Sequence, residues 1–170
     1  MNFEDYIAVV EGFPKPGISF KDISPLLRDG NAFHECIDDM SAIVKEWNPT
    51  LIIGPESRGF VFGLPISYSL KVGFAMARKK GKLPGKVISK SYALEYNTAT
   101  IEVPEDSIKP GDRVVLVDDL LATGGTLKAI QLIVESRGAK VVGIITLIEL
   151  KDLEGYRVLE NVPYKALLSL

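Results

Sequence analysis

Residues 114–126 have the sequence VVLVDDLLATGGT, and this stretch decides the fold. Its first four residues are apolar and mostly β-branched, which predicts a buried central strand followed by two carboxylates and a small, hydroxyl-rich turn. The apolar spacing of Leu127, Ile130 and residues 132–134 then predicts a helix. Ligands of an open α/β sheet bind at the carboxyl ends of its strands, so we expect the binding site beside Asp118 and Asp119.

The turn after the strand favours phosphate as a ligand. It consists of Ala122, Thr123, Gly124, Gly125 and Thr126. Its glycines let backbone amides point inward, and its threonines add hydroxyls at a helix N-terminus, where anions bind. It lacks the lysine of a nucleoside-triphosphate loop, and it does not match the dinucleotide-binding glycine pattern.

The two acids beside this turn predict a second part of the ligand. Asp118 and Asp119 would repel a phosphate, so we expect them to face sugar hydroxyls, a magnesium ion or both, and ribose 5-phosphate fits such a site. The alternative is that the acids cap a helix and the glycines make an ordinary turn. A cap needs only one acid and no glycine pair, which disfavours that interpretation.

A second strand-to-helix turn is expected at residues 54–59. Residues 51–53 predict a buried strand and residues 60–70 a helix, so the turn between them opens on the same crevice. Arg58 in this turn offers a planar cationic fork to phosphate oxygens or to a base edge. The alternative is that Arg58 is a surface residue that forms a salt bridge.

Residues 78–90 carry six basic residues and no acid, which predicts a polyanionic ligand in a chain of net charge -2. Arg78, Lys79 and Lys82 are our candidates for contacts to pyrophosphate. The alternative is a solvated basic loop. Residues 91–103 predict a hairpin after this segment.

The remaining elements follow from apolar periodicity and turn residues. We expect helices at residues 3–10, 31–47 (capped by Asn31) and 151–159, an extended segment at 18–21, a tight turn at 109–112, and strands at 72–77, 140–149 and 164–168. Strands that alternate with helices predict a mostly parallel, doubly wound sheet.

Composition limits the function classes. The chain has 170 residues, 46% of them hydrophobic, which predicts one domain. Its net charge of -2 disfavours a general nucleic-acid binder. Cys36 is the single cysteine and His34 the single histidine, so neither an intrachain disulfide nor the usual zinc cluster is expected; we expect Cys36 in the core and His34 on the surface. No signal peptide or membrane span is evident, and we expect a cytoplasmic protein.

The motifs resemble those of the type I phosphoribosyltransferases. Residues 114–126 are similar to the phosphoribosyl-diphosphate fingerprint of that family. Residues 13–18 (FPKPGI), 22–27 (DISPLL), 57–60 (SRGF), 78–85 (RKKGKLPG) and 94–96 (LEY) resemble its adenine-using branch. The resemblance runs from about residue 13 to the C-terminus and implies the type I phosphoribosyltransferase fold.

The resemblance implies transfer of ribose 5-phosphate from phosphoribosyl diphosphate to N9 of adenine, giving AMP and pyrophosphate in purine salvage. It implies one phosphoribosyltransferase domain over residues 1–170, with a base-binding segment at about 1–30 and a flexible hood at about 79–103. It also implies a homodimer and a Mg²⁺ cofactor held mainly by the substrate diphosphate and ribose, with no direct protein ligand.

The family resemblance also implies roles for single residues of these motifs. The resemblance places the 5-phosphate on residues 122–126, the ribose hydroxyls on Asp118 and Asp119, and the adenine or pyrophosphate side on Arg58. It places the base between Phe20 and Leu120, beside Ile18 and Ser19, and it makes Glu95 the acid/base residue near adenine N7, with Tyr96 next to the substrate.

Two alternatives stay open. Ser19 stands where an apolar residue is expected in the base-binding segment, and this matters only if the side chain packs on the purine. The two alternative functions are a phosphoribosyltransferase for another base and a non-catalytic sensor of phosphoribosyl diphosphate. Such a sensor needs a DNA-reading module, for which the residues before Phe13 are too few and too acidic.

Overall fold

The computed structural model describes residues 1–94 and 96–170, which divide into two compact units, Met1–Asp39 and Met40–Leu170. The expectation of one phosphoribosyltransferase domain over the whole chain stays a prediction.

The N-terminal unit begins with a 3-10 turn, η1 (Phe3–Tyr6), followed by the antiparallel strands β1 (Ala8–Glu11) and β2 (Ser19–Asp22). The predicted helix over residues 3–10 is therefore wrong beyond Tyr6. Val9 and Val10 pair with Lys21 and Phe20, and β-branched valines suit a strand, so pairing with β2 prevails over the helical spacing. The extended segment expected at residues 18–21 is confirmed as β2.

Two helices follow, α1 (Ser24–Arg28) and α2 (Gly30–Glu46), of which the sequence predicted only the second. The cap of α2 is Asp29 rather than Asn31. The Asp29 carboxylate accepts hydrogen bonds from the backbone amides of Asn31 and Ala32 at 3.0 and 2.9 Å, which satisfies donors that a helix start leaves open. As expected, Cys36 is buried and His34 is exposed.

In the described part of the second unit, seven strands form one sheet in the order β5-β6-β4-β3-β7-β8-β9. Their bounds are β3 (Leu51–Pro55), β4 (Gly73–Lys79), β5 (Val87–Ala93), β6 (Thr98–Pro104), β7 (Arg113–Leu121), β8 (Lys140–Glu149) and β9 (Tyr164–Ser169). The strands from β4 to β9 in this order run parallel, whereas β6 and β5 are antiparallel to their neighbours. The mostly parallel sheet is confirmed.

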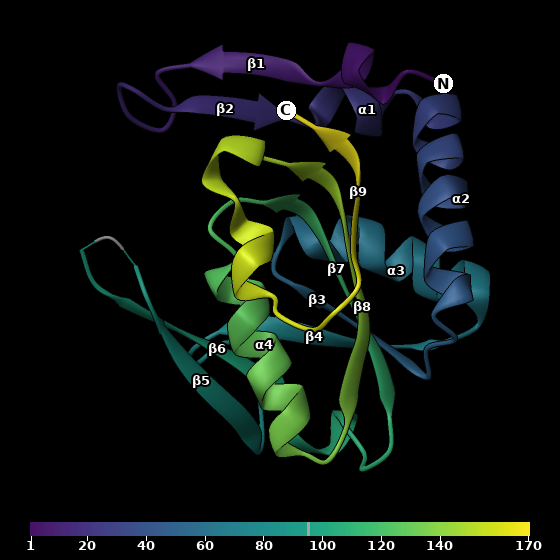
Figure 1. The fold of residues 1–170 in the computed structure, drawn as a ribbon, viewed down its shortest axis with the longest axis vertical. Helices are drawn as coiled ribbons and strands as arrows, with labels where there is room; N and C mark the ends of the chain where they lie inside the picture. The colour runs from purple at the N-terminus through teal and green to yellow at the C-terminus, as the bar shows by residue number, and fades with distance from the viewer. Residues whose placement is uncertain (95) are drawn as a thin grey trace. The chain divides into compact units, whose positions relative to one another are not determined.

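Helices cover both faces of this sheet. Helix α3 (Arg58–Leu70) leads from β3 to β4, and α4 (Gly125–Ser136) leads from β7 to β8 in the opposite direction across the sheet. Because both crossovers are expected to be right-handed, they put α3 and α4 on opposite faces, as Figure 1 shows. Burial on both faces explains why β3 and β8 are nearly continuous apolar runs.

The direction in which the chain crosses the sheet reverses between β3 and β7. The crossover from β3 leads to β4 on one side, and the crossover from β7 leads to β8 on the other. Ligands of doubly wound sheets bind at the carboxyl ends of strands at such a switch point. Strand β7 is longer than the sequence indicated and continues to Leu121. Asp118 and Asp119 therefore lie within the strand rather than after it.

The C-terminal region differs from its prediction. The helix expected at residues 151–159 is two 3-10 turns, η3 (Lys151–Leu153) and η4 (Gly155–Val158), separated by Glu154 at a φ of 48°. A left-handed residue cannot continue a helix, which accounts for the break. The edge strand β9 is confirmed, and another 3-10 turn, η2 (Glu105–Ser107), precedes β7. Within the described residues, no helix combines the length and apolarity that crossing a membrane requires.

Candidate active site at the β3–β7 switch point

The turn between β7 and α4 forms an open anion cradle. Gly124 caps α4 at a φ of 85°, a left-handed conformation that favours glycine. Its carbonyl accepts a hydrogen bond from the Lys128 amide at 2.9 Å. The amides of the first helical turn, before Lys128, have no partner within a helix and point out of its end. Such an end attracts anions, and phosphate at this turn stays a prediction.

The 3-10 turn η4 supports this cradle from behind. A Cβ atom on Gly124 would lie 2.6 Å from the Gly155 carbonyl oxygen, and a Cβ on Gly155 would collide with the carbonyl oxygen of Ala122. Both contacts are with backbone, which cannot rotate away as a side chain can. The close approach of the two segments therefore requires glycine at both positions.

A cavity of about 130 Å³ joins the cradle to one of the acids. Its lining includes the predicted site residues Asp118, Leu120, Ala122, Thr123, Gly124, Gly125 and Thr126, together with Leu121, Leu127 and the hairpin residues Tyr92, Ala93 and Leu94. The structure thus brings the predicted phosphate turn, one carboxylate and the start of the hood around one space. Among the described residues, Arg58, Arg78, Lys79, Lys82 and Tyr96 do not line it.

Asp118 and Asp119 have different surroundings although they are neighbours. Asp119 is 3% exposed, and its carboxylate forms an ion pair with the Arg58 guanidinium, Oδ2 to Nε 3.0 Å. Asp118 accepts a hydrogen bond from the Asp119 amide at 2.8 Å and lines the cavity. Burial raises the pKa of Asp118 well above its ordinary value, and the nearby charge of Asp119 raises it further. Burial also raises the pKa of Asp119, whereas the nearby charge of Arg58 lowers it in part.

Arg58 is the first residue of α3, in the turn that follows β3. A cis peptide bond joins Glu56 to Ser57 in this turn. A Cβ on Gly59 would lie 3.1 Å from the Asp118 carboxylate, so the β3–α3 turn and the end of β7 are in close contact. Arg58 does form an ion pair, as the alternative interpretation supposed, but its partner is a buried acid of the site.

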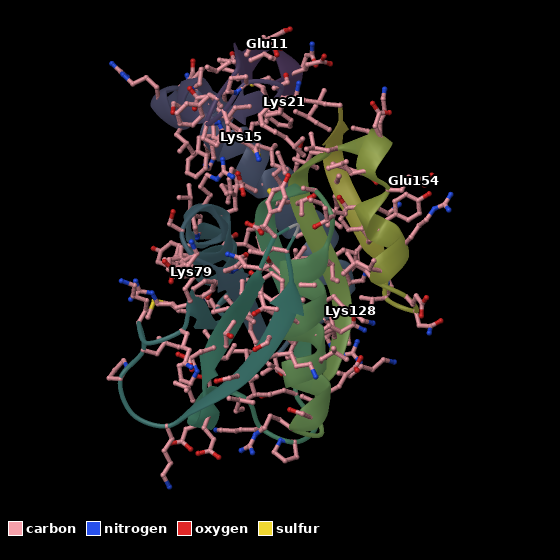
Figure 2. All side chains as sticks on the ribbon, turned by 90° about the vertical axis from the view of Figure 1, so that its left-hand side faces the viewer. Glu11, Lys15, Lys21, Lys79, Lys128 and Glu154 are labelled. Atoms are coloured by element: carbon pink, nitrogen blue, oxygen red, sulfur yellow. The ribbon has the colours of Figure 1, made fainter. Side chains whose placement is uncertain are left out.

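Two acids outside the basic segment (residues 78–90) bind its first residues: Glu56 of the β3–α3 turn and Glu102 of β6. Glu56 accepts the Lys79 amide at 2.9 Å and pairs with the Arg78 guanidinium at 3.3 Å. The Lys79 amide, followed by the Arg78 charge, lowers the pKa of Glu56. The Glu102 carboxylate accepts the Gly81 amide at 2.7 Å. These bonds hold the segment beside the β3–α3 turn and leave the Lys79 and Lys82 side chains exposed, the first of them labelled in Figure 2.

The predicted base-binding residues lie in the N-terminal unit. Phe20 packs edge to face on Phe13 with ring centroids 5.1 Å apart, and both line an open cavity of about 390 Å³. The Ile18 carbonyl accepts the Gly12 amide at 2.7 Å, and the Ile18 amide donates to the Lys15 carbonyl at 3.2 Å. Both polar main-chain groups of Ile18 are therefore used inside the hairpin.

Other predicted roles are not resolved by this geometry. Glu95 lies outside the described residues. Tyr96 is exposed near the end of the hairpin. Because Phe20 and Leu120 belong to different units, their enclosure of a base stays a prediction. Tyr92 was missed by sequence reasoning, since its proximity to the phosphate turn arises from contact between β5 and α4, which no local motif signals.

The described residues contain no group of three His, Cys, Asp or Glu side chains able to hold a metal ion. The donor chemistry nevertheless fits Mg²⁺, which prefers oxygen ligands and keeps part of its shell for substrate phosphates. Asp119 is ion-paired with Arg58, whereas Asp118 presents a carboxylate to the cavity. Asp118 is therefore the acid that could contact such an ion or the ribose to which it binds.

Comparison with known proteins gives a consistent result. Residues 23–167 match the model of the phosphoribosyl transferase domain. The chain is 51% identical over 170 residues to the adenine phosphoribosyltransferase of Desulfitobacterium hafniense, covering 96% of this chain and 98% of that one. The adenine phosphoribosyltransferase structure from Thermoanaerobacter pseudethanolicus superposes with a TM-score of 0.96 at 44% identity, over 99% and 98% of the two chains. The Saccharomyces cerevisiae structure, complexed with adenine and an imino-altritol bisphosphate, has a TM-score of 0.93 at 34% identity, over 98% and 96%.

Proposed function

Since this chain belongs to the phosphoribosyltransferase family, and within it to the adenine phosphoribosyltransferases, we propose how its own residues carry out the reaction. The reaction transfers ribose 5-phosphate from phosphoribosyl diphosphate to N9 of adenine and yields AMP and pyrophosphate, a step of purine salvage. The observation that supports our assignment is the shared cavity in which Asp118 faces the phosphate turn.

The 5-phosphate binds at the turn between β7 and α4. The amides of the first turn of α4 and the hydroxyls of Thr123 and Thr126 donate hydrogen bonds to its oxygens, and the helix dipole favours its charge. Gly124 and Gly155 allow the backbone to curl around this group. Holding the far end of the substrate in this way fixes the position of its reacting carbon.

The ribose hydroxyls bind the carboxylates at the end of β7. Asp118, which lines the cavity, is the direct contact, while Asp119 is held by Arg58 and adds negative charge behind it. The bond from the ribose carbon to pyrophosphate breaks as the bond to adenine N9 forms, and positive charge develops on the sugar ring. Fixed carboxylates nearby stabilise that charge.

The leaving pyrophosphate requires cations. Lys79 and Lys82 are exposed, and the Lys79 amide binds Glu56 of the β3–α3 turn. We assign both lysines to this group, while Arg58 and Arg78, each paired with an acid, add positive charge. Neutralising the leaving group lowers the barrier to its departure. The hood, residues 79–103, excludes water that would compete with adenine as the nucleophile.

Adenine binds between Phe20 and Leu120, beside Ile18, Ser19 and Tyr96, and loses a ring proton as the new bond forms. Glu95 is our candidate acid/base group, because a carboxylate near N7 is suited to proton transfer. Mg²⁺, when bound to the diphosphate and ribose, supplies further charge neutralisation.

The homodimer that the family resemblance implies is also a proposal, which light scattering of the purified protein tests.

The test is to incubate the protein with phosphoribosyl diphosphate, Mg²⁺ and a panel of nucleobases and to identify products by mass spectrometry. We expect AMP and pyrophosphate with adenine, and a strong loss of both with Asp118→Asn. A nucleotide formed equally well from guanine or hypoxanthine would contradict the base assignment. Full activity of Asp118→Asn would contradict the site assignment.

A further inference from the structure

Tyr92 connects the hairpin to the phosphate turn. It lies on β5, opposite Ala99 of β6, and β5 packs against α4 (Figure 1). The Thr126 hydroxyl donates a hydrogen bond to the Tyr92 hydroxyl at 3.0 Å. Thr126 is one of the two residues whose hydroxyls we assign to the 5-phosphate.

The Tyr92 ring also explains a glycine of the turn. A Cβ atom on Gly125 would lie 3.3 Å from Cδ2 of the Tyr92 ring, which is tighter than an ordinary contact. Unlike Gly124, Gly125 does not have a positive φ. A larger residue at this position would therefore press on the Tyr92 ring, which would have to shift to accept it.

Tyr92 lines two cavities, as do Ala93, Thr123 and Gly125. It lines the cavity of about 130 Å³ that holds the phosphate turn, and it lines a second one of about 290 Å³ between β5 and α4, beside Lys90 and Lys128. Figure 2 labels Lys128, on α4, and Lys79, with the hairpin between them. The aromatic ring is thus a wall of the phosphate site, and its hydroxyl is a polar group at the edge of that wall.

We propose that Tyr92 is a positioning residue for the 5-phosphate, acting through Thr126. This inference rests on the proposed assignment of the 5-phosphate to residues 122–126. Without ligand, the Thr126 proton is directed to Tyr92. When phosphate binds, the Tyr92 hydroxyl donates to Thr126 Oγ1 instead, and Thr126 directs its own proton to a phosphate oxygen. Both groups can reverse in this way, because each hydroxyl is a donor and an acceptor.

The experiment compares Tyr92→Phe with Tyr164→Phe. Tyr164 is a matched control, because its hydroxyl forms a similar bond to a threonine, Thr146, at 2.8 Å, and we assign neither residue to the site. We measure kcat, the KM of phosphoribosyl diphosphate, the KM of adenine, and the Kd values of ribose 5-phosphate and pyrophosphate. Tyr92→Phe should raise the first KM and the Kd of ribose 5-phosphate about three- to tenfold, the effect of one hydrogen bond. It should leave the constants of adenine and pyrophosphate unchanged, whereas Tyr164→Phe should change none of them.

The second measurement tests coupling through Thr126. Thr126→Ala should weaken ribose 5-phosphate, Thr126→Ser should restore it, and Tyr92→Phe should add nothing in the Thr126→Ala background. If Thr126→Ala weakens ribose 5-phosphate while Tyr92→Phe does not, the role of Tyr92 is overturned and the phosphate assignment stands. If neither variant weakens it, both are overturned. Equal weakening of all ligands by Tyr92→Phe would mean general packing of the hood, which also overturns the proposal.

Discussion

Asp118 and Asp119 are neighbouring, chemically identical residues whose carboxylates have different partners. Both belong to β7, which continues to Leu121, and their carboxyl groups lie close enough to interact with each other and with Arg58. One lines the cavity, and the other is paired with Arg58. The sequence predicted both as ligands of the ribose, whereas the structure favours Asp118 as the direct contact and Asp119 as its charged support.

The raised pKa of Asp118 predicts that replacing this acid makes the folded protein more stable, although the replacement lowers its activity. Because its pKa in the folded protein lies above the ordinary value of 3.8, the folded state binds the proton more tightly than the unfolded state. Stability therefore falls as the pH rises from 3.8 through that raised pKa. Asn cannot ionise, so Asp118→Asn should be more stable than the wild type at pH 7 and show a smaller loss between acidic and neutral pH.

Urea unfolding at several pH values measures this effect, and Glu56→Gln is the control of opposite sign. The Lys79 amide and Arg78 lower the pKa of Glu56, so its contribution to stability is present above the ordinary value of 4.5 and lost as the pH falls through the lowered pKa. Glu56→Gln should therefore be less stable than the wild type at pH 7.

Asp118→Asn should also lose activity by tens- to thousands-fold, since removing a charged partner costs about 2 to 5 kcal/mol. Unchanged turnover with lower stability would show that Asp118 is structural.

Glu95→Gln should lower kcat more than it raises the KM of adenine. The amide has the same size but cannot exchange a proton, and a positioned acid/base group contributes about a hundred- to ten-thousand-fold. Steady-state kinetics over a range of pH is the measurement, and one limb of the kcat profile should disappear. An increase in KM with kcat intact would make Glu95 a binding residue instead.

At the scale of elements, the phosphate turn depends on η4 as much as on its own glycines. Gly155→Ala puts a methyl group against the Ala122 carbonyl, and the backbone of the turn must move to accept it. We expect a raised KM for phosphoribosyl diphosphate, with a loss of stability of about 1 to 3 kcal/mol. Gly30→Ala is the control, because a Cβ there meets nothing within 4 Å. Steady-state kinetics and thermal unfolding of both variants test this, and equal behaviour of the two would refute the support by η4.

How far the sequence predicts these elements depends on whether local pattern or distant pairing decides them. Strands β3, β7 and β8 each contain a run of apolar residues, so the pattern alone predicts them, as it predicts α4. The apolar residues 8–10 also suit a helix, and only the pairing of residues 8–11 with β2 makes them a strand. The break of residues 151–159 depends on the left-handed Glu154, which no residue type signals in advance.

The same distinction holds for the site. Residues 118–126 form one local strand, turn and helix, so their composition was sufficient to predict the phosphate turn and the acids. The ion pair of Arg58 with Asp119 and the contact of Tyr92 with Thr126 join residues distant in the chain. Such contacts depend on the sheet order and on how β5 lies against α4, and these are properties of the folded protein rather than of a motif.

At the scale of the whole molecule, the proposed reaction needs groups from both units. Ile18, Ser19 and Phe20, which we propose as base contacts, belong to Met1–Asp39, whereas Leu120, the phosphate turn and the acids belong to Met40–Leu170. Ser19, where the sequence departs from the expected apolar residue, forms a hydrogen bond from its hydroxyl to the Glu11 carboxylate at 3.0 Å. Figure 2 labels Glu11 and Lys21, whose side chains both approach Ser19. The Ser19 side chain is thus engaged within the hairpin, which favours recognition of the base by main-chain groups.

The pairing of β1 with β2 indicates which main-chain groups these are. Gly12 donates to the Ile18 carbonyl, and two residues further along Val10 stands opposite Phe20. In an antiparallel ladder, bonded and non-bonded pairs alternate, so Ser19, opposite Glu11, turns its amide and carbonyl away from β1. An amide and a carbonyl together match N1 and the 6-amino group of adenine, whereas a 6-oxopurine presents the opposite pattern.

We therefore expect strong preference for adenine, and we expect it to depend on the backbone of Ser19 rather than on its side chain. A site built on hydrogen bonds rejects a mismatched analogue by roughly ten-thousand-fold, because buried groups would stay unpaired. Ser19→Ala should keep this preference, while Ser19→Pro, which removes the amide, should lower kcat/KM for adenine and narrow the ratio to guanine and hypoxanthine. The measurement is kcat/KM for each base at saturating phosphoribosyl diphosphate. A ratio near one in the wild type would refute selection of adenine by this hairpin, and loss of the preference in Ser19→Ala would assign it to the hydroxyl instead.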